Sequence, residues 1–239
     1  DCRTDKELEK EAVDFLMRKR VDGIINMPVD TQGKHLEAFG QTGKPIVLID
    51  RSIQGLACDC VLVDNHRAAQ EAVELLMENG HKNIGIIGGP RDVFTARERL
   101  DGYFQAHKRR GIPVQESLIY HGDYTIQGGV EGLTALHRRN PHMTAVFVTN
   151  YEMTMGAVIG SNEMGISIPQ ELSVIGFDNL SFARACSPKL TIVSQPTEGI
   201  AREVARIILS RLQKEGGEPV TEKLQTEIIP GKSIKNLAE

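Results

Sequence analysis

Residues 172–179 read L-S-V-I-G-F-D-N, and this stretch decides the fold class. An apolar run stops abruptly at a carboxylate, Asp178, which an amide, Asn179, follows. This pattern is typical of a buried parallel strand that presents polar side chains at its carboxyl end. Ligands of open α/β sheets bind outside the carboxyl ends of the strands. The stretch therefore predicts an α/β protein and makes Asp178 a candidate wall of a binding cleft.

Three other apolar runs end in the same way. Residues 45–50 end in Asp50, residues 145–150 end in Thr149 and Asn150, and residues 190–195 end in Ser194 and Gln195. Together the four ends predict a polar rim that holds a small hydroxylated ligand. The alternative for any one of them is an N-cap of the next helix. For Asn150 both interpretations stay open.

Composition excludes several classes of protein. The 239 residues are 40% hydrophobic and 25% charged, which is ordinary for a globular chain. The formal net charge of -4 gives no basic footprint for nucleic acid. No run of 18 apolar residues is present, so we expect no membrane span.

The cysteines and histidines predict neither a metal site nor catalysis. The four cysteines (Cys2, Cys58, Cys60 and Cys186) lack paired C-x-x-C spacing, and we expect reduced thiols in a cytoplasmic protein. The seven histidines show no H-E-x-x-H spacing, and no serine lies in G-x-S-x-G. We therefore expect no metal, no cofactor and no enzymatic activity.

One unit recurs along the chain: a helix, a glycine, a short turn and an apolar strand. Helices expected at 31–42, 65–79, 95–110 and 151–164 stop at glycines suited to the left-handed C′ position, namely Gly43, Gly80, Gly111 and Gly165. This alternation predicts βαβ units and parallel sheets. The long connection at 50–63, and Gln195-Pro196 before a helix at 197–214, suit a chain that crosses between two lobes. A last strand is expected at 224–229.

Six segments in a fixed order carry a family resemblance. They are M-E-N-G-H-K-N-I-G-I-I-G-G-P (77–90), T-A-R-E-R-L-D-G-Y (95–103), G-D-Y (122–124), T-N-Y-E-M-T-M-G (149–156), M-G-I-S-I-P-Q-E-L-S-V-I-G-F-D-N (164–179) and S-P-K-L-T-I-V-S-Q-P (187–196). In this order the chain resembles, over nearly its whole length, the effector-binding core of LacI/GalR-type transcriptional repressors.

The resemblance implies a type I periplasmic-binding-protein-like fold, with two doubly wound parallel-sheet lobes joined by three crossings. The N-terminal lobe is expected at 1–63 plus 196–223, and the C-terminal lobe at 64–195 plus 224–239. Family members are homodimers, and an effector in the interlobe cleft, often a sugar, changes operator affinity. Carried over residue by residue, the implied effector contacts are Asp50, Thr95, Arg99, Tyr124, Asn150, Asp178 and Gln195. Arg97 lies in the same motif, and we expect a structural role for it.

The family also carries segments that would precede Asp1. They are a helix-turn-helix headpiece, a hinge and a first strand–helix–strand, the last of which is about one βαβ unit of roughly thirty residues. We therefore expect the N-terminal lobe to be incomplete at its start and operator binding to belong to a longer parent protein.

The chemistry of the implied contacts fits a sugar. A carboxylate such as Asp178 accepts from two hydroxyls, and Arg99 is a fixed fork of donors. Thr95 with Glu98 three residues later predicts a capping box at the start of the Arg99 helix. The alternative for Arg99 is a surface ion pair on that helix. The alternative for Tyr124 is core packing rather than stacking on the ligand.

Other functions stay open at this point. The family usually has Asp after Asn150, where this chain has Tyr151, so no particular sugar is transferred. A transport-linked sugar-binding protein would share the fold, which alone does not separate the two functions. A doubly wound enzyme is a second alternative. A regulator that answers to a protein partner, through the lobe that carries residues 1–63, is a third.

Overall fold

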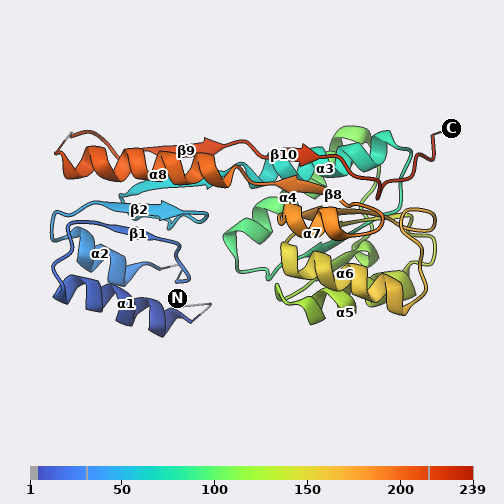
Figure 1. Cartoon of the computed structure of the whole chain (residues 1–239), viewed down its shortest axis with the longest axis horizontal. Helices are drawn as coiled ribbons and strands as arrows, with labels where there is room; N and C mark the ends of the chain where they lie inside the picture. The colour runs from blue at the N-terminus through green and yellow to red at the C-terminus, as the bar shows by residue number, and fades with distance from the viewer. Residues whose placement is uncertain (1–4, 31, 215, 239) are drawn as a thin grey trace. The chain divides into compact units, whose positions relative to one another are not determined.

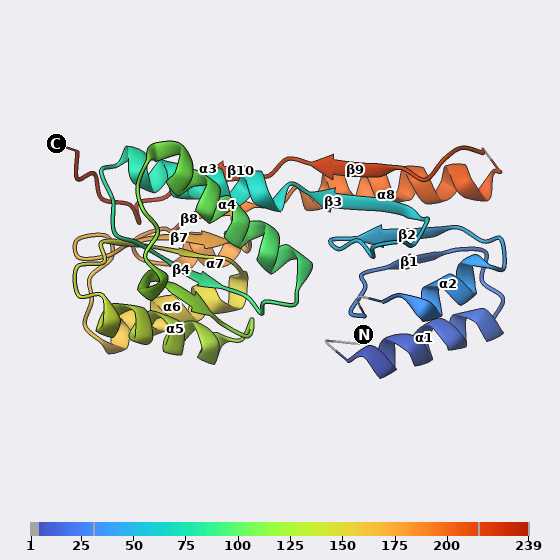
Figure 2. The ribbon, with the colours of Figure 1, turned by 180° about the vertical axis from the view of Figure 1, so that it is seen from behind.

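The apolar runs of the sequence form two separate, mainly parallel β-sheets covered by helices (Figures 1 and 2). The computed structural model describes residues 5–30, 32–214 and 216–238. Unit 1 comprises Asp1–Val63 and Pro196–Leu224, and unit 2 comprises Asp64–Gln195 and Gln225–Glu239. The chain thus passes from one unit to the other three times.

Unit 1 holds a four-stranded parallel sheet between two helical layers. The strand order is β1 (Ile24–Asn26), β2 (Ile46–Ile49), β3 (Asp59–Val63) and β9 (Thr221–Leu224). Helices α1 (Lys6–Arg18) and α2 (Lys34–Gly40) cover one face, and α8 (Thr197–Leu212) covers the other (Figure 1). Leu48 packs toward α1 and α2 whereas its neighbour Val47 packs toward α8, as the two-residue period of a strand requires.

Unit 2 holds a six-stranded sheet that is parallel except at one edge. The strand order is β10 (Glu227–Ile229), β8 (Thr191–Ser194), β7 (Ser173–Phe177), β6 (Ala145–Val148), β4 (Ile84–Gly88) and β5 (Ile119–His121), with β10 antiparallel to β8. Figure 2 shows α3 (Asn65–Glu78) and α4 (Phe94–Arg110) on one face, and α5 (Ile126–Arg139) and α6 (Tyr151–Glu163) on the other. Two short helices, a 3-10 turn at Glu116–Leu118 and α7 at Leu180–Ala185, complete the unit.

The glycines expected after helices have the left-handed conformation. Gly43, Gly80, Gly111 and Gly165 have φ of 76°, 85°, 65° and 70°. Each follows or closes the last turn of its helix, so the chain reverses toward the next strand without the steric penalty of a Cβ. The doubly wound α/β fold expected from the sequence is confirmed by the two sheets and their helical layers.

Three expectations from the sequence were wrong or incomplete. Thr95 does not cap α4, which begins at Phe94 with Val93 as an N-cap that makes no side-chain hydrogen bond. Of the strand expected at 224–229, only Glu227–Ile229 form β10 in unit 2, whereas Leu224 is the last residue of β9 in unit 1, a strand that was not predicted. The sequence analysis assigned no helix to α5. Position 31 of the helix expected at 31–42 and Cys2 lie outside the described residues.

Candidate functional site

Arg99 is buried at the carboxyl edge of the unit 2 sheet, with 5% of its surface exposed. Its Nε donates to Asn65 Oδ1 at 2.8 Å, and its Nη1 donates to the carbonyl of Thr149. The guanidinium carbon lies 3.7 Å from the centre of the Phe177 ring, a stacked cation–π geometry. The alternative of a surface ion pair therefore does not describe this arginine.

Asp178 and Gln195 meet at the ends of neighbouring strands. Gln195 donates to Asp178 twice, from Nε2 to Oδ2 at 2.7 Å and from its backbone N–H to Oδ1 at 3.4 Å. The pairing of β7 with β8 brings them together, because Phe177 lies opposite Val193 in the register. Asn179 uses its Oδ1 to cap α7, accepting from the Phe182 N–H at 2.9 Å.

Tyr124 and Thr95 form a second pair on this edge. The Tyr124 hydroxyl lies 3.4 Å from Thr95 Oγ1, and Thr95 is 3% exposed. The ring lies against Gly89, where a Cβ would come within 2.3 Å of a ring carbon. Tyr124 packs on the core with one side and stays partly exposed. This contact also explains why Thr95 is not a cap, since its hydroxyl is turned inward.

Asn150 is the N-cap of α6. Its Oδ1 accepts from the Met153 N–H at 2.9 Å, so the capping interpretation is correct as far as Oδ1 goes. The Nδ2 group takes no part in that cap. The preceding residue, Thr149, is fully buried, and its Oγ1 donates to the Ile87 carbonyl at 3.1 Å. This bond helps to hold Thr149, whose own carbonyl accepts from Arg99.

Asp50 ends a strand of the other unit. It follows β2, and its Oδ2 lies 3.4 Å from Nε of Arg51. Arg51 in turn donates from Nη1 to the Pro28 carbonyl at 3.3 Å. Asp50 thus belongs to unit 1, whereas the other six residues named from the sequence lie along one edge of unit 2.

Backbone strain gathers at these strand ends. Among the residues that the structure describes, six non-glycine residues have positive φ, and four of them lie at the ends of β2, β5 and β7: Asp50 (66°), Tyr124 (66°), Asp178 (63°) and Asn179 (51°). Positive φ in a non-glycine residue costs of order 1–3 kcal/mol and is found at ligand sites that require a particular side-chain direction.

Two residues that hold Arg99 in place were not predicted from the sequence, and neither was a buried carboxylate in unit 1. Asn65, fully buried, and Phe177 bind Arg99 from two sides. The signal for Asn65 was present, since Asp64-Asn65 ends the apolar run of β3 just as Asp178-Asn179 ends β7. In unit 1 the buried carboxylate of Glu9 accepts from Asn26 Nδ2 at 2.6 Å and from the backbone N–H groups of Val29 and Asp30, and no helical periodicity indicated it.

The described residues show neither a metal-binding cluster nor a membrane-spanning helix. Within residues 5–30, 32–214 and 216–238, no group of three or more His, Cys, Asp and Glu side chains could hold a metal ion. No helix in those same ranges is long and apolar enough to cross a membrane.

Comparison with known proteins gives a consistent result. Residues 73–234 match the family of periplasmic binding protein-like domains. The HTH-type transcriptional repressor PurR of Actinobacillus pleuropneumoniae serotype 3 (strain JL03) is 32% identical over 240 residues, which cover 99% of this chain and 71% of that protein.

Two solved structures are also similar. The transcriptional regulator CelR in complex with cellobiose superposes with a TM-score of 0.87 at 31% identity, over 95% of this chain and 70% of that one. A LacI family regulator from Enterococcus faecium with bound ribose gives 0.86 at 26% identity, over 95% and 85%. By fold, by the family match and by its relatives, this chain belongs to the LacI/GalR-type transcriptional regulators and is their periplasmic-binding-protein-like domain.

Proposed function

We propose that this chain is the effector-sensing part of a transcriptional repressor and that its effector is a sugar or sugar derivative bound at the carboxyl edge of unit 2. The arrangement of Arg99 carries the proposal. A guanidinium that is fixed by Asn65, Thr149 and Phe177 presents its donors without further loss of side-chain freedom.

The neighbouring groups suit a hydroxylated ligand. Asp178 is an acceptor already oriented by Gln195, and charge-assisted hydrogen bonds to a carboxylate are the strong ones. The partly exposed ring of Tyr124 offers a surface on which the apolar face of a sugar can stack. Two similar regulators were solved with cellobiose and with ribose, which supports the same ligand class here.

The regulation we propose is a population shift. Asp50 comes from unit 1 and the other contacts come from unit 2. An effector that contacts both units stabilises the arrangement of the units in which it makes both contacts. The shift in the equilibrium between the arrangements is set by the difference between the effector's affinities for them. We further propose that the parent protein is a cytoplasmic homodimer that binds operator DNA through a helix-turn-helix headpiece, and that it is a regulator rather than an enzyme.

A thermal-shift screen tests the ligand class. Sugars, sugar phosphates and nucleobases are compared on the wild-type chain and on Asp178→Ala. A true effector at about one hundred times its dissociation constant adds about 2.7 kcal/mol to the free energy of unfolding. We expect one sugar class to raise the melting temperature of the wild type and not that of Asp178→Ala.

The control is Asp101→Ala, which removes an exposed carboxylate from the same unit. It should keep the full shift. A shift that survives in Asp178→Ala, or one obtained only with nucleobases, would contradict the proposed site or the proposed ligand class.

A further inference from the structure

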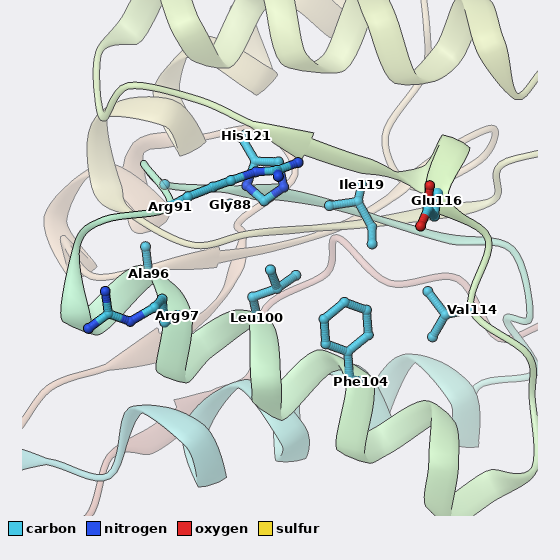
Figure 3. A pocket seen from close by; sticks show the side chains of 11 residues that line it. Gly88, Arg91, Ala96, Arg97, Leu100, Phe104, Val114, Glu116, Ile119 and His121 are labelled. Carbon is cyan, nitrogen blue, oxygen red and sulfur yellow. The ribbon is translucent and has the colours of Figure 1, made fainter.

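A pocket of about 680 Å³ is lined by Leu100 and Phe104 of α4 (Figure 3), and Arg99 is not among its lining residues. Leu100 follows Arg99 directly, and so points about 100° further round the helix. The pocket is lined by residues of α4, of β5, which is the edge strand of its sheet, and of the segment that joins them. The sequence analysis did not anticipate this pocket.

The pocket has an apolar floor and two different ends. Leu100 and Phe104 from α4 face Val114 and Ile119 across the floor, as Figure 3 shows, and Phe104 is 37% exposed. Glu116 lies at one end, where it gives a negative charge.

The opposite end is positively charged. Arg91 extends toward His121 beside Gly88 (Figure 3). Burial and then the positive charge of Arg91 hold the pKa of His121 below its ordinary value. An anion at this end would contact Arg91 directly. The negative charge of Glu116 disfavours an anion at the other end.

We propose that this pocket binds a small amphipathic anion, an aromatic or other apolar body that carries one phosphate, sulfonate or carboxylate group. Its volume falls within the range of about 300–1,000 Å³ that small-molecule sites occupy. The body lies on Leu100 and Phe104, and the anionic group pairs with Arg91, whose guanidinium matches such groups in a planar fork.

The pocket shares structure with the rim that we assign to the effector. Gly89 lines the pocket, and the ring of Tyr124 lies against the same glycine. Helix α4 carries Thr95 and Arg99 on one face, and it carries Leu100 and Phe104 on the adjacent face of the same helix. Resting on the proposed function, we expect the two ligands to alter each other's affinity by the same factor. Binding in the pocket itself does not depend on that function.

The probe that tests the pocket is 1-naphthyl phosphate, titrated into the whole chain by calorimetry. Inorganic phosphate and 1-naphthol are the two halves of the probe. We expect one saturable site per chain and binding of either half at least about tenfold weaker, a difference of about 1.4 kcal/mol. In a ¹⁵N-labelled sample the amide signals of Gly88 and Gly89 should move on titration.

Two pairs of variants locate the bound probe. Phe104→Ala and Arg91→Gln should each weaken the probe at least about tenfold, and Phe104→Leu guards against a folding defect. The matched controls are Ile159→Ala and Arg202→Gln, which change exposed side chains on other helices (Ile159 is 39% exposed). Both variants should bind the probe as the wild type does.

Three results would overturn the proposal. One is the absence of saturable binding to the wild type. The second is binding that survives Phe104→Ala and is lost in Asp178→Ala, which places the probe at the rim instead. The third is a change of oligomeric state in Phe104→Ala by sedimentation, which makes the pocket an interface between copies. A failed sugar screen with intact probe binding would refute only the proposed effector.

Discussion

Single residues at the strand ends carry both strain and polar chemistry. Asp50, Tyr124 and Asp178 all have positive φ without being glycine, and all three were named from the sequence as contacts. Such residues persist only where the surrounding structure holds them. Replacing such a residue by glycine should therefore relieve strain and remove binding together.

The first prediction concerns Asp50→Gly. Glycine adopts a φ of 66° freely, and the lost pair with Arg51 is long, 3.4 Å, and partly solvated. We expect the free energy of unfolding to stay level or rise by about 0.5–1 kcal/mol while effector affinity falls. Urea denaturation and calorimetry measure the two effects.

The matched control is Asp22→Gly in the same unit. Asp22 is exposed and is not among the residues with positive φ, so glycine there should lower stability. Equal losses in both variants would mean that Asp50 is not strained.

The second prediction concerns Arg99→Lys. Lysine keeps the charge and loses the fork that reaches Asn65 and Thr149 at once. We expect a loss of about 1–3 kcal/mol in stability, because the buried hydrogen bond from Arg99 Nε to Asn65 Oδ1 is lost, and at least a roughly tenfold loss in effector affinity. Arg109→Lys, exposed on the same helix, should change neither. Wild-type affinity in Arg99→Lys would remove Arg99 from the effector site.

The sequence reveals polar side chains that directly follow an apolar run, but it does not reveal which aromatic or helical side chains make buried contacts. Asp178 and Gln195 were predicted because an apolar run stops at each, and the structure brings them within 2.7 Å. Phe177 was missed because an aromatic at the end of an apolar run looks like core. Glu9 was missed because nothing in a helical pattern indicates which carboxylate turns inward.

At the scale of elements, close helix pairs depend on glycine. A Cβ on Gly102 of α4 would lie 2.2 Å from the His66 carbonyl of α3, and one on Gly156 of α6 would lie 2.0 Å from the Ile126 carbonyl of α5. Both sites therefore exclude any larger residue. They set how near each helix comes to its neighbour.

The third prediction is that Gly102→Ala destabilises the chain. Helix propensity alone favours alanine by up to about 1 kcal/mol, but overpacking costs typically about 1–3 kcal/mol, and the contact here is with rigid backbone. Urea denaturation should show the loss. Gly40→Ala is the control, since its Cβ would lie 3.6 Å from the nearest side chain. A stabilised Gly102→Ala would show that α3 and α4 can separate readily.

The C-terminal segment is held to the sheet by a buried histidine. His81 is 1% exposed, with Nδ1 2.9 Å from Thr144 Oγ1 and Nε2 3.0 Å from the Lys235 carbonyl. Burial, more than any other influence, lowers the pKa of His81 below its ordinary value. The folded chain therefore keeps His81 neutral at a pH where the unfolded chain protonates it.

The fourth prediction follows from the lowered pKa of His81 in the folded chain. The stability that depends on neutral His81 is fully present above about pH 6.5, the unfolded pKa, and is lost as the pH falls through the lower folded pKa. The free energy of unfolding, measured by urea denaturation, should differ less between pH 7.5 and pH 5.5 in His81→Gln than in the wild type. His142→Gln, an exposed site, should keep the wild-type difference. An unchanged difference in His81→Gln would assign the pH dependence to other groups.

The alternation of helix, glycine and strand made most of the fold predictable. Helix α5 escaped because Gly128, Gly129 and Gly132 weaken its helical signal, and those glycines are required by contacts with neighbouring elements. The start of α4 was misplaced because Thr95 bonds to Tyr124, a partner distant in sequence. Strand β9 was missed because Thr221, Glu222 and Lys223 form no apolar run, and its last residue, Leu224, was assigned to the following strand, β10.

At the scale of the whole molecule, the chain crosses between its two units at three places. Residues named as effector contacts lie in both units, so the effector we propose would bias the arrangement of the units by contacting each. In a parent dimer, such a bias would change how two DNA-binding headpieces match their half-sites. If the proposal is correct, effector binding at the carboxyl edge of unit 2 and operator affinity are coupled.

The most direct test is operator affinity of the parent protein, at one fixed salt concentration, with and without the effector found in the screen. DNA selected from a random pool by the parent itself serves as operator. We expect the effector to change operator affinity by about 5- to 150-fold in the wild type and not at all in Asp178→Asn, whose affinity without effector equals that of the wild type. An Asp178→Asn protein that responds to the effector as fully as the wild type would refute the proposed coupling.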